Sequence, residues 1–336
     1  MMNFPVDIVY TWVDNKDPIW KEKKKKALHE ININPEANED CRFISSNELL
    51  YSIRSVYKYC SWFNKIYIIT DSQVPKWLDI ANNDDIIIID HNEIFNKKGK
   101  LPTFNSNVIE SRIHYIPHLC EHYIYFNDDF FIGRDLKKDF FFYNNGCPKI
   151  YMTKMKPKQK VLNSITPEKM LKQTLYPRNL NNARKLVFDK CNKLVRNYPI
   201  HNPKAFRKSD ILKVESNFSD MITESLLHQF RSSDGIYFLA LCMFYLIAQG
   251  VEISVMKPYR GRRLLYNIPY FCRNRDFIYI KLGIDSKLTK KYENILKYRP
   301  AYFCINDTNI SSDSDRKSMV LFLSKYYPDR TNVEKL

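Results

Sequence analysis

The sequence predicts an α/β fold, a mostly parallel sheet flanked by helices, with a smaller, helical and basic second lobe. Three observations support this. Apolar, strand-like runs alternate with helical patterns over the first 135 residues, each of these runs ends at a carboxylate, and the chain becomes strongly basic beyond Gly133. Alternating strands and helices are typical of parallel sheets, which bind ligands at the carboxyl ends of their strands.

Four apolar runs predict the strands of this sheet, at residues 6–13, 65–70, 86–89 and 123–126. They end at Asp14, Asp71, Asp90 and Asp128. The second and third runs are continuously apolar, as expected for strands buried on both faces. The pattern therefore predicts a sheet with its acids gathered along one edge.

Two helices are predicted between these strands. Ser45 and Glu48 have the spacing of a capping box, and the apolar residues that follow place Arg54 on a helix with one apolar face. A further helix is expected from Ser106 or Asn107 toward Pro117. The lysine run at residues 21–26 is typical of a solvated helix face, with a phosphate-binding patch as the alternative.

Composition limits the class of protein. The 336 residues are 44% hydrophobic and 14% aromatic with only 7 Gly, which describes a folded globular chain. The net charge of +16 predicts an anionic partner, whether nucleic acid, acidic lipid, a nucleotide or a charged polymer. Residues 149–213 hold 17 basic and 3 acidic side chains, and residues 260–263 are again basic.

Eight scattered cysteines without a CxxC pair argue against a zinc ribbon or a thioredoxin-type site. No secretory signal is evident at the start, so free thiols in a reducing cytoplasm are expected. The longest apolar run, 236–248, is too short to span a bilayer, so any membrane association would be peripheral.

Two adjacent carboxylates, Asp128 and Asp129, follow the fourth strand and precede another apolar run. Unpaired acids among aromatic residues are costly, and a divalent cation would neutralise them. Hard oxygen ligands suit Mg²⁺ or Mn²⁺. The alternative is a solvated turn. Because successive strand side chains point to opposite faces, the two acids are not expected to hold one ion unless the strand has already turned.

Other polar residues could also carry chemistry. Histidines 114, 118 and 122 have helical spacing, but Pro117 interrupts it, so a zinc site there is disfavoured. His201, in a proline-bounded loop, is a better candidate for a reactive group, and a hydrogen-bonded loop histidine is the alternative. Arg231 precedes the most apolar helix, and the run from Phe303 to Asp307 repeats the pattern of an apolar strand that ends in polar groups.

Several common enzyme motifs are missing from the sequence. There is no Walker loop, GxGxxG, GxSxG or HExxH. The usual nucleotide-hydrolase, dehydrogenase, serine-hydrolase and zincin classes are therefore disfavoured.

The assembled blocks resemble the Stealth proteins, a family of sugar-phosphate transferases. Four blocks match in order: Asp7–Asp14 with Asp17-Pro18; Arg42-Phe43 through Asn47-Glu48-Leu49, Ser52–Ser55 and Ile68–Asp71 to Pro75–Leu78; Phe104–Asn107 and Ile109-Glu110 leading to Asn127–Asp129; and Cys304–Asp307 followed by Phe322-Leu323 and Tyr327-Pro328. His201 and Arg231 correspond to elements that relatives carry between the third and fourth blocks. The stretch 149–196 has no clear counterpart.

The resemblance implies a GT-A-like, Rossmann-type core. Residues 1–135 and 300–336 would form the nucleotide-sugar-binding core, and residues 136–299 a basic helical acceptor lobe. The implied reaction transfers hexose-1-phosphate, in particular N-acetylhexosamine-1-phosphate, from a UDP-sugar to a glycan hydroxyl and releases UMP. The alternative is a conventional glycosyltransferase that releases UDP.

The resemblance also implies roles for individual residues. Mg²⁺ or Mn²⁺ would be held by Asp128 or Asp129, with Asp307. Arg231 would stabilise charge on phosphate, and His201 would be the general base. The expected substrate-binding residues are Asp14, Arg54, Asn47, Asn105, Asn107, Glu110 and Asp307.

The implied partners are a UDP-activated amino sugar and an anionic, phosphodiester-linked glycan acceptor, at the inner face of the cytoplasmic membrane or free in the cytoplasm. A non-enzymatic nucleic-acid-binding protein is a third hypothesis, disfavoured because no RNA- or DNA-binding motif is present. The sequence leaves the oligomeric state open.

Overall fold

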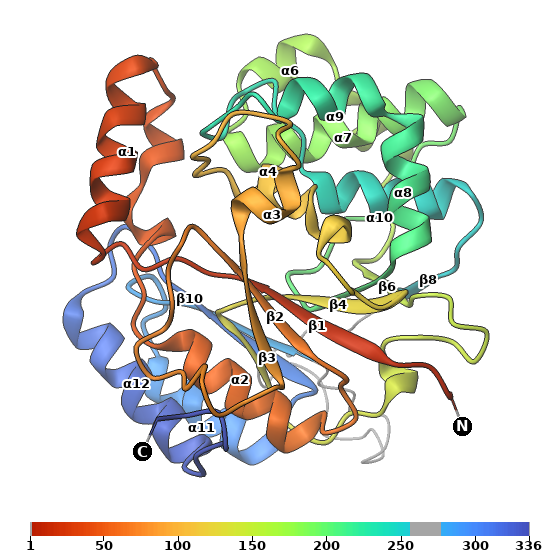
Figure 1. Ribbon diagram of the computed structural model, residues 1–336. Coiled ribbons are helices and arrows are strands. Elements are labelled where there is room, and N and C mark those ends of the chain that lie inside the picture. The colour runs from red at the N-terminus through yellow and green to blue at the C-terminus, as the bar shows by residue number, and fades with distance from the viewer. Residues whose placement is uncertain (1, 256–276, 336) are drawn as a thin grey trace.

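The computed structural model describes residues 2–255 and 277–335, so the predicted basic run at 260–263 lies outside the described residues. A five-stranded sheet in the order β3-β2-β1-β4-β7 forms its centre. Strands β1 to β4 are parallel, and β7 runs antiparallel beside β4. Helices cover both faces: α3, α4 and α7 to α10 lie on one side and α2, α11 and α12 on the other (Figure 1). The mostly parallel sheet flanked by helices is confirmed.

The bounds of the elements are as follows. The strands are β1 Val6–Thr11, β2 Ile66–Thr70, β3 Ile86–Asp90, β4 His122–Asn127, β5 Phe130–Ile132, β6 Ile150–Met152, β7 Lys204–Arg207, β8 Ile253–Val255, β9 Phe277–Lys281 and β10 Tyr302–Asn306. The α-helices are α1 Pro18–Glu30, α2 Glu48–Tyr59, α3 His91–Phe95, α4 Ser106–Glu110, α5 Lys158–Ser164, α6 Pro167–Leu171, α7 Leu175–Cys191, α8 Lys208–Asn217, α9 Ser219–Ser225, α10 Phe238–Ala248, α11 Leu288–Tyr298 and α12 Asp313–Tyr326. Short 3-10 helices occupy Pro35–Asn38, Asp40–Arg42, Ile113–Tyr115 and Lys138–Phe140.

Strand alternation divides the core into two layers. Val9 and Tyr125 face the cluster that contains α7, α8 and α10, whereas Ile8 and Ile124 face the cluster that contains α2. Successive side chains point to opposite faces of a strand, so the inner residues of β1 and β4 are buried on both faces of the sheet. Packing on both faces holds the central strands in place, and because β1 to β4 are parallel, their carboxyl ends lie at the same edge of the sheet.

A second, three-stranded sheet in the order β5-β10-β9 adjoins this edge. β5 follows β4 after a two-residue turn but pairs with β10, antiparallel, and β10 pairs with β9 in parallel. The C-terminal strand therefore lies beside the turn at residues 128–129. Two strands of the segment 136–299 join these sheets, β7 the central one and β9 the smaller one.

Three local predictions are wrong. The helix expected to run toward Pro117 ends at Glu110. Ser111 is its C-cap, and the Ser111 hydroxyl donates to the Val108 carbonyl. The predicted capping box is absent: Asn47 precedes α2 in a left-handed conformation, and the Glu48 carboxylate accepts from the Ser46 amide. Strand β3 lies at the edge of the sheet and is only partly buried: Ile86 and Ile89 lie in opposite core layers, but Ile87 is exposed.

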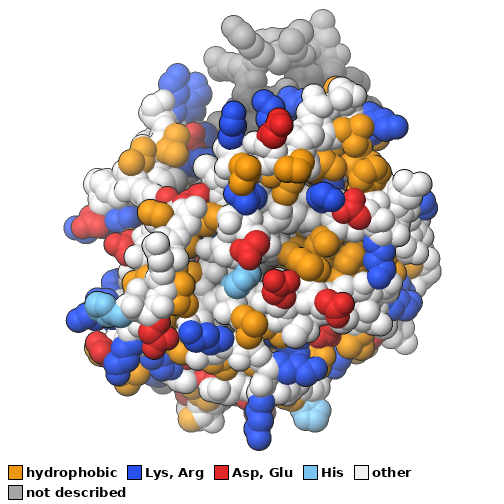
Figure 2. All heavy atoms as spheres, turned by 90° about the horizontal axis from the view of Figure 1, so that it is seen from above, with side chains coloured by type: hydrophobic (Ala, Val, Ile, Leu, Met, Phe, Trp, Pro, Cys, Tyr) orange, Lys and Arg blue, Asp and Glu red, His pale blue; other side chains and the backbone are white. Residues whose placement is uncertain are grey.

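On the face seen in Figure 2, the basic residues form no single patch. Figure 2 looks down on the face above the sheet, where Lys and Arg side chains lie in separate groups among acidic and apolar ones. Some of the basic residues in 149–213 have structural partners, including Arg207 with Asp210 and the buried Arg184 with the Val195 and Asn197 carbonyls. The lysine run lies on α1, where Lys23 pairs with Asp71 and Lys24 lies over the Phe43 ring.

Two expectations about the chain as a whole can be compared with the described residues. None of the helices described in residues 2–255 and 277–335 has the length and apolar character needed to cross a membrane. The seven cysteines in the described residues are all free thiols, as expected; Cys272 lies outside them.

Candidate active site

The two predicted acids occupy the turn between β4 and β5. Strand β4 ends at Asn127 and β5 begins at Phe130, so strand alternation no longer separates Asp128 from Asp129. The Asp129 Oδ2 atom accepts from the Cys304 thiol at 3.1 Å and from the Asn306 amide at 3.3 Å. Both partners come from β10, so the neighbouring sheet supplies contacts that the first 135 residues could not reveal.

The two acids have opposite pKa shifts. Burial would raise the pKa of Asp129, but His201 and the hydrogen bonds from Cys304 and Asn306 more than offset it, so the pKa lies below its usual value. Burial, reinforced by the charges of Asp129 and Glu48, raises the pKa of Asp128 well above its usual value. Asp129 is therefore the ionised member, and Asp128 ionises readily only when a cation is near.

A third carboxylate, Glu48, belongs to this cluster. Glu48 starts α2 and is 5% exposed. Burial raises the pKa of Glu48 to about 7, and the negative charges of Asp129 and Asp307 add to the rise. Because Glu48 was interpreted as part of a capping box, it was not predicted to lie among the acids at the sheet edge.

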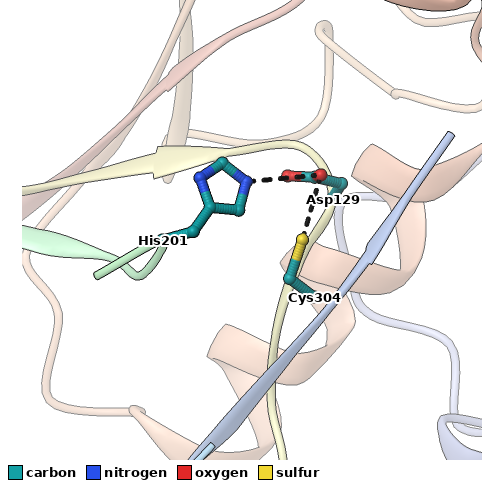
Figure 3. A group of neighbouring side chains, drawn as sticks. All are labelled: Asp129, His201 and Cys304. Atoms are coloured by element: carbon teal, nitrogen blue, oxygen red, sulfur yellow. Dashed lines mark hydrogen bonds and ion pairs between the residues drawn. The ribbon is translucent and has the colours of Figure 1, made fainter. Parts of the chain in front are cut away.

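His201 lies beside Asp129, as Figure 3 shows. Its Nε2 atom is 3.8 Å from Asp129 Oδ2, an ion-pair distance, and this buried nitrogen has no hydrogen-bond partner. The ring makes edge contacts with Phe130 at 4.7 Å and with Tyr279 at 5.5 Å between ring centroids. The imidazole is thus held in place by packing while Nε2 stays free to take a proton.

A buried lysine lies between two parts of the site. Lys204 is 6% exposed on β7, and its ammonium donates to the Asn202 carbonyl at 2.9 Å. Burial lowers the pKa of Lys204 to about 8, partly countered by the negative charges of Glu110 and Asp129. Because both carboxylates act on one ammonium, Lys204 connects the Asp129 cluster with Glu110.

Glu110, at the end of α4, forms the second part of the site. Its Oε1 accepts from the Tyr125 hydroxyl at 3.1 Å, and that hydroxyl also meets Thr11 at 2.8 Å. The other oxygen, Oε2, is buried without a partner. Burial raises the pKa of Glu110 to about 7, although the positive charges of Arg231 and Lys204 oppose the rise.

Arg231 is held next to Glu110 by the two predicted asparagines. The guanidinium donates to the Ser106 hydroxyl at 2.6 Å. The Asn105 amide donates to the Phe230 carbonyl at 3.2 Å, and the Asn107 amide donates to Asn179, which in turn donates to the Ser232 carbonyl. Asn105 and Asn107 therefore fasten the Arg231 loop to α4.

Four other predicted residues have different surroundings. The carboxylate of Asp307 is engaged by the Arg316 guanidinium at 2.8 Å, so Asn306 rather than Asp307 contacts Asp129. Arg54 is bonded to Glu334 and to the Tyr327 carbonyl. The final predicted pair lies in loops: the Asp14 carboxylate accepts from the Lys16 amide, and Asn47 is exposed. The structure does not bring Asp14, Asn47 or Arg54 into contact with Asp129, whereas Asp307 lies near enough to Glu48 for its charge to raise the pKa of that carboxyl.

The three spaced histidines do not meet. His114 pairs with Glu215 at 2.7 Å, together with Arg112, whereas His122 stacks on Phe4 at 3.9 Å between ring centroids. His118 is exposed. Packing roles, expected from the break at Pro117, are confirmed for the first and last of these.

Lys204 and Glu48 were missed by sequence reasoning. A lysine that opens the short apolar run Lys204-Ala205-Phe206 was the available signal for the first. For the second, the signal was a glutamate directly before an apolar helix, which a capping box explains equally well. Neither pattern reveals burial beside other charges, because the partners come from distant segments.

The donor atoms fit a hard divalent cation. The negative charge of Asp129 raises the pKa values of both Asp128 and Glu48, and Asp129 Oδ1 is buried without a partner. Mg²⁺ and Mn²⁺ bind carboxylate oxygens and would relieve this repulsion. Asp307, expected as a further ligand, is instead paired with Arg316.

Comparisons with known proteins identify the proteins that the chain resembles. Residues 4–31 match the model of Stealth protein conserved region 1, and residues 42–150 match conserved region 2. Among solved structures, the galactosyltransferase LgtC, in complex with donor and acceptor sugar analogues, aligns over 97% of both chains with a TM-score of 0.45 and 10% identity.

Curated relatives are polysaccharide phosphotransferases by name. The capsular polysaccharide phosphotransferase of Haemophilus influenzae is 36% identical over 96% of this chain and 84% of its own length. LcbA of Neisseria meningitidis, of the same description, is 35% identical over 90% of this chain and 78% of its own. An exopolysaccharide phosphotransferase of Streptomyces coelicolor is 33% identical over 99% of this chain, which spans 57% of that relative. By these matches, the chain belongs to the Stealth family.

Proposed function

We propose that this protein is a capsular polysaccharide phosphotransferase that transfers hexose-1-phosphate from a UDP-activated amino sugar to a glycan hydroxyl and releases UMP. One observation supports it most: a free buried imidazole nitrogen, a carboxylate cluster, the buried Lys204 ammonium and the partly buried Arg231 guanidinium converge at one sheet edge. The names of its relatives place phosphotransfer in polysaccharide synthesis. Such transfer needs a base, a metal-binding carboxylate and cations to bind phosphate oxygens.

In this proposal, each residue has a defined task. His201 Nε2 takes the proton of the acceptor hydroxyl, whose oxygen attacks the β-phosphorus as the bond to the UMP oxygen breaks. Asp129, at 3.8 Å, stabilises the imidazolium that results. Arg231 and Lys204 bind phosphate oxygens on which charge accumulates. Glu110 keeps both cations in position through its charge.

The carboxylates would hold the cofactor. Asp128 and Asp129, with Glu48 nearby, are the proposed ligands of Mg²⁺ or Mn²⁺. When bound, the cation would supply Lewis-acid stabilisation of the diphosphate and the leaving UMP.

The acceptor is proposed to be an anionic, phosphodiester-linked glycan. The net charge of +16 supports attraction to such a polymer, and binding should weaken with salt because the basic groups are on the surface. We place the protein in the cytoplasm or at the inner face of the cytoplasmic membrane, where activated sugars are available.

Identification of the nucleotide product tests the proposal. The protein would be incubated with UDP-N-acetylglucosamine, Mg²⁺ and a phosphodiester oligosaccharide, with Asp129→Asn as the control. UMP, together with a new phosphodiester signal in ³¹P NMR, is the expected result. Release of UDP with a new glycosidic bond would show the conventional glycosyltransferase instead.

A further inference from the structure

We propose that Asp129, His201 and Cys304 form a binding site for Zn²⁺, and that zinc bound there inhibits the enzyme. The inhibition rests on the proposed function, whereas the binding does not. Figure 3 shows the three side chains pointing toward one another from the β4–β5 turn, the loop before β7 and β10. One ligand atom from each lies within 4.8 Å of the other two.

Two of the three separations are close to those that zinc requires, and the third, between Cys304 Sγ and His201 Nε2, is at most 4.8 Å. Zn–S bonds of about 2.3 Å and Zn–N or Zn–O bonds of about 2.0 Å in a tetrahedral arrangement put ligand atoms roughly 3.3 to 3.5 Å apart. Asp129 Oδ2 is 3.1 Å from Cys304 Sγ and 3.8 Å from His201 Nε2. Both distances therefore need to change by only a few tenths of an ångström.

The donor set favours zinc over magnesium. A thiolate, an imidazole nitrogen and a carboxylate are ligands of a borderline-soft ion, whereas Mg²⁺ takes oxygen. A thiolate and a carboxylate together would neutralise the two positive charges of the ion. Three protein ligands leave the fourth position for water, which is the arrangement of open zinc sites.

The ligands are already held in place. Cys304 is 1% exposed on β10, and the His201 ring is packed between Phe130 and Tyr279. His201 Nε2 has no hydrogen-bond partner to lose. The Asn306 amide donates to Asp129 Oδ2 and so orients that carboxylate, as outer partners of metal ligands commonly do.

Zinc binding would displace the thiol proton that now points at Asp129. The Zn–S bond forms, and the proton passes to solvent. Bound zinc also occupies the lone pair of His201 Nε2, the atom proposed to take the acceptor proton. The inhibited state would therefore lack a base, and Asp129 Oδ2 would be bound to zinc.

Cobalt binding tests the site without any activity. Purified protein would be titrated with Co²⁺, whose thiolate complexes give a charge-transfer band and whose tetrahedral complexes give intense visible bands. We expect both in the wild-type protein and their loss in Cys304→Ser, with Zn²⁺ competing for the site. Cys147→Ser, which removes a thiol elsewhere, should leave the spectrum unchanged. Wild-type protein without the charge-transfer band would overturn the proposal.

A second measurement connects binding to inhibition. Zinc should inhibit wild-type transfer in saturating Mg²⁺, and at least about 100-fold more zinc should be needed for Cys304→Ser, each variant compared with its own zinc-free rate. Equal sensitivity of the two proteins would refute zinc inhibition through Cys304. Asp129→Asn, examined by cobalt titration alone, should also lose affinity and serves if Cys304→Ser does not fold. If no transfer occurs with any protein while cobalt binds, the proposed function fails and the metal site stands.

Discussion

Two groups of charged residues, all predicted from sequence as site residues, differ in how completely they are paired. Arg54 and Asp307 are engaged: Arg54 Nη2 lies 2.5 Å from Glu334, and Arg316 lies 2.8 Å from Asp307. Glu110 and Asp129, at the sheet edge, each leave one buried carboxylate oxygen without a partner. Burying an unpaired polar atom costs about 1 to 3 kcal/mol, so such atoms persist where a ligand supplies the missing partner.

The comparison separates structural charges from functional ones. The Arg54 pair ties α2 to the C-terminal segment, since Arg54 also donates to the Tyr327 carbonyl. Glu110, Lys204 and Asp129 form a chain of buried charges whose pKa values are all displaced. Displaced pKa values in a partly unpaired cluster are typical of active sites. Substitutions in the Arg54 group should therefore lower stability, whereas substitutions in the Asp129 group should lower activity.

The largest effect on turnover is expected at the turn that contains Asp128 and Asp129. Asp128→Asn or Asp129→Asn should lower turnover by at least about 1,000-fold, because a neutral amide is a poor ligand for a hard cation. The folded state should survive, since removal of a carboxylate also relieves repulsion in the cluster. Steady-state kinetics with Mg²⁺, alongside thermal unfolding, measures both. If both variants keep near-normal rates, the metal assignment is wrong.

His201→Ala should reduce kcat by about 100-fold to 10,000-fold, the usual contribution of a general base. Binding of UDP-N-acetylglucosamine should persist, because the imidazole acts on the acceptor proton. Titration calorimetry with the nucleotide sugar separates the two quantities. His118→Ala, at an exposed position, is the control and should behave as the wild type. Loss of folding in His201→Ala would instead support a structural histidine.

Arg54→Ala should act on stability. Removal of Arg54 takes its closest cation from the Glu334 carboxylate, whose side chain is 4% exposed, and leaves it with Arg330 at 3.8 Å, at a cost of about 2 kcal/mol. Urea unfolding measures this loss, and kcat per folded molecule should be unchanged. A variant with wild-type stability and a raised KM for the UDP-sugar would return Arg54 to the substrate site, as the resemblance implied.

The smallest effect is a change in pH dependence. Glu110 has a pKa of about 7 in the folded protein, against a reference value of 4.5, so the folded state holds a proton that the unfolded state has lost. Stability from this group is complete below about pH 4.5 and declines as the pH rises to 7, by about 2 kcal/mol between pH 5 and 7. Lys204, at about 8, titrates above that window.

Glu110→Gln should therefore remove that decline. Urea midpoints of the two proteins measured from pH 5 to 7 give the difference directly, and Asp139→Asn, on a surface 3-10 helix, is a control for general charge effects. Parallel curves for wild type and Glu110→Gln would show that Glu110 is ionised throughout, its charge compensated by Arg231 and Lys204.

The sequence by itself determined the first four strands, their mostly parallel arrangement, which sets Asp128 and Asp129 at a strand end, and the family. Continuous apolar runs and polar strand ends are local patterns, so they can be recognised without knowing which distant segments come together. His201, in its proline-bounded loop, was identified for the same reason. Its place beside Asp129 could not be, since the contact joins residues 72 positions apart.

Only the tertiary structure decided which charges are paired. Arg54 finds Glu334 across 280 positions, and Asp129 finds Cys304 across 175, through the pairing of β5 with β10. Lys204 is buried because β7 joins the central sheet antiparallel to β4. Whether a charge is structural or reactive depends on burial and on its partners, and these are set by contacts between distant segments that no local pattern contains.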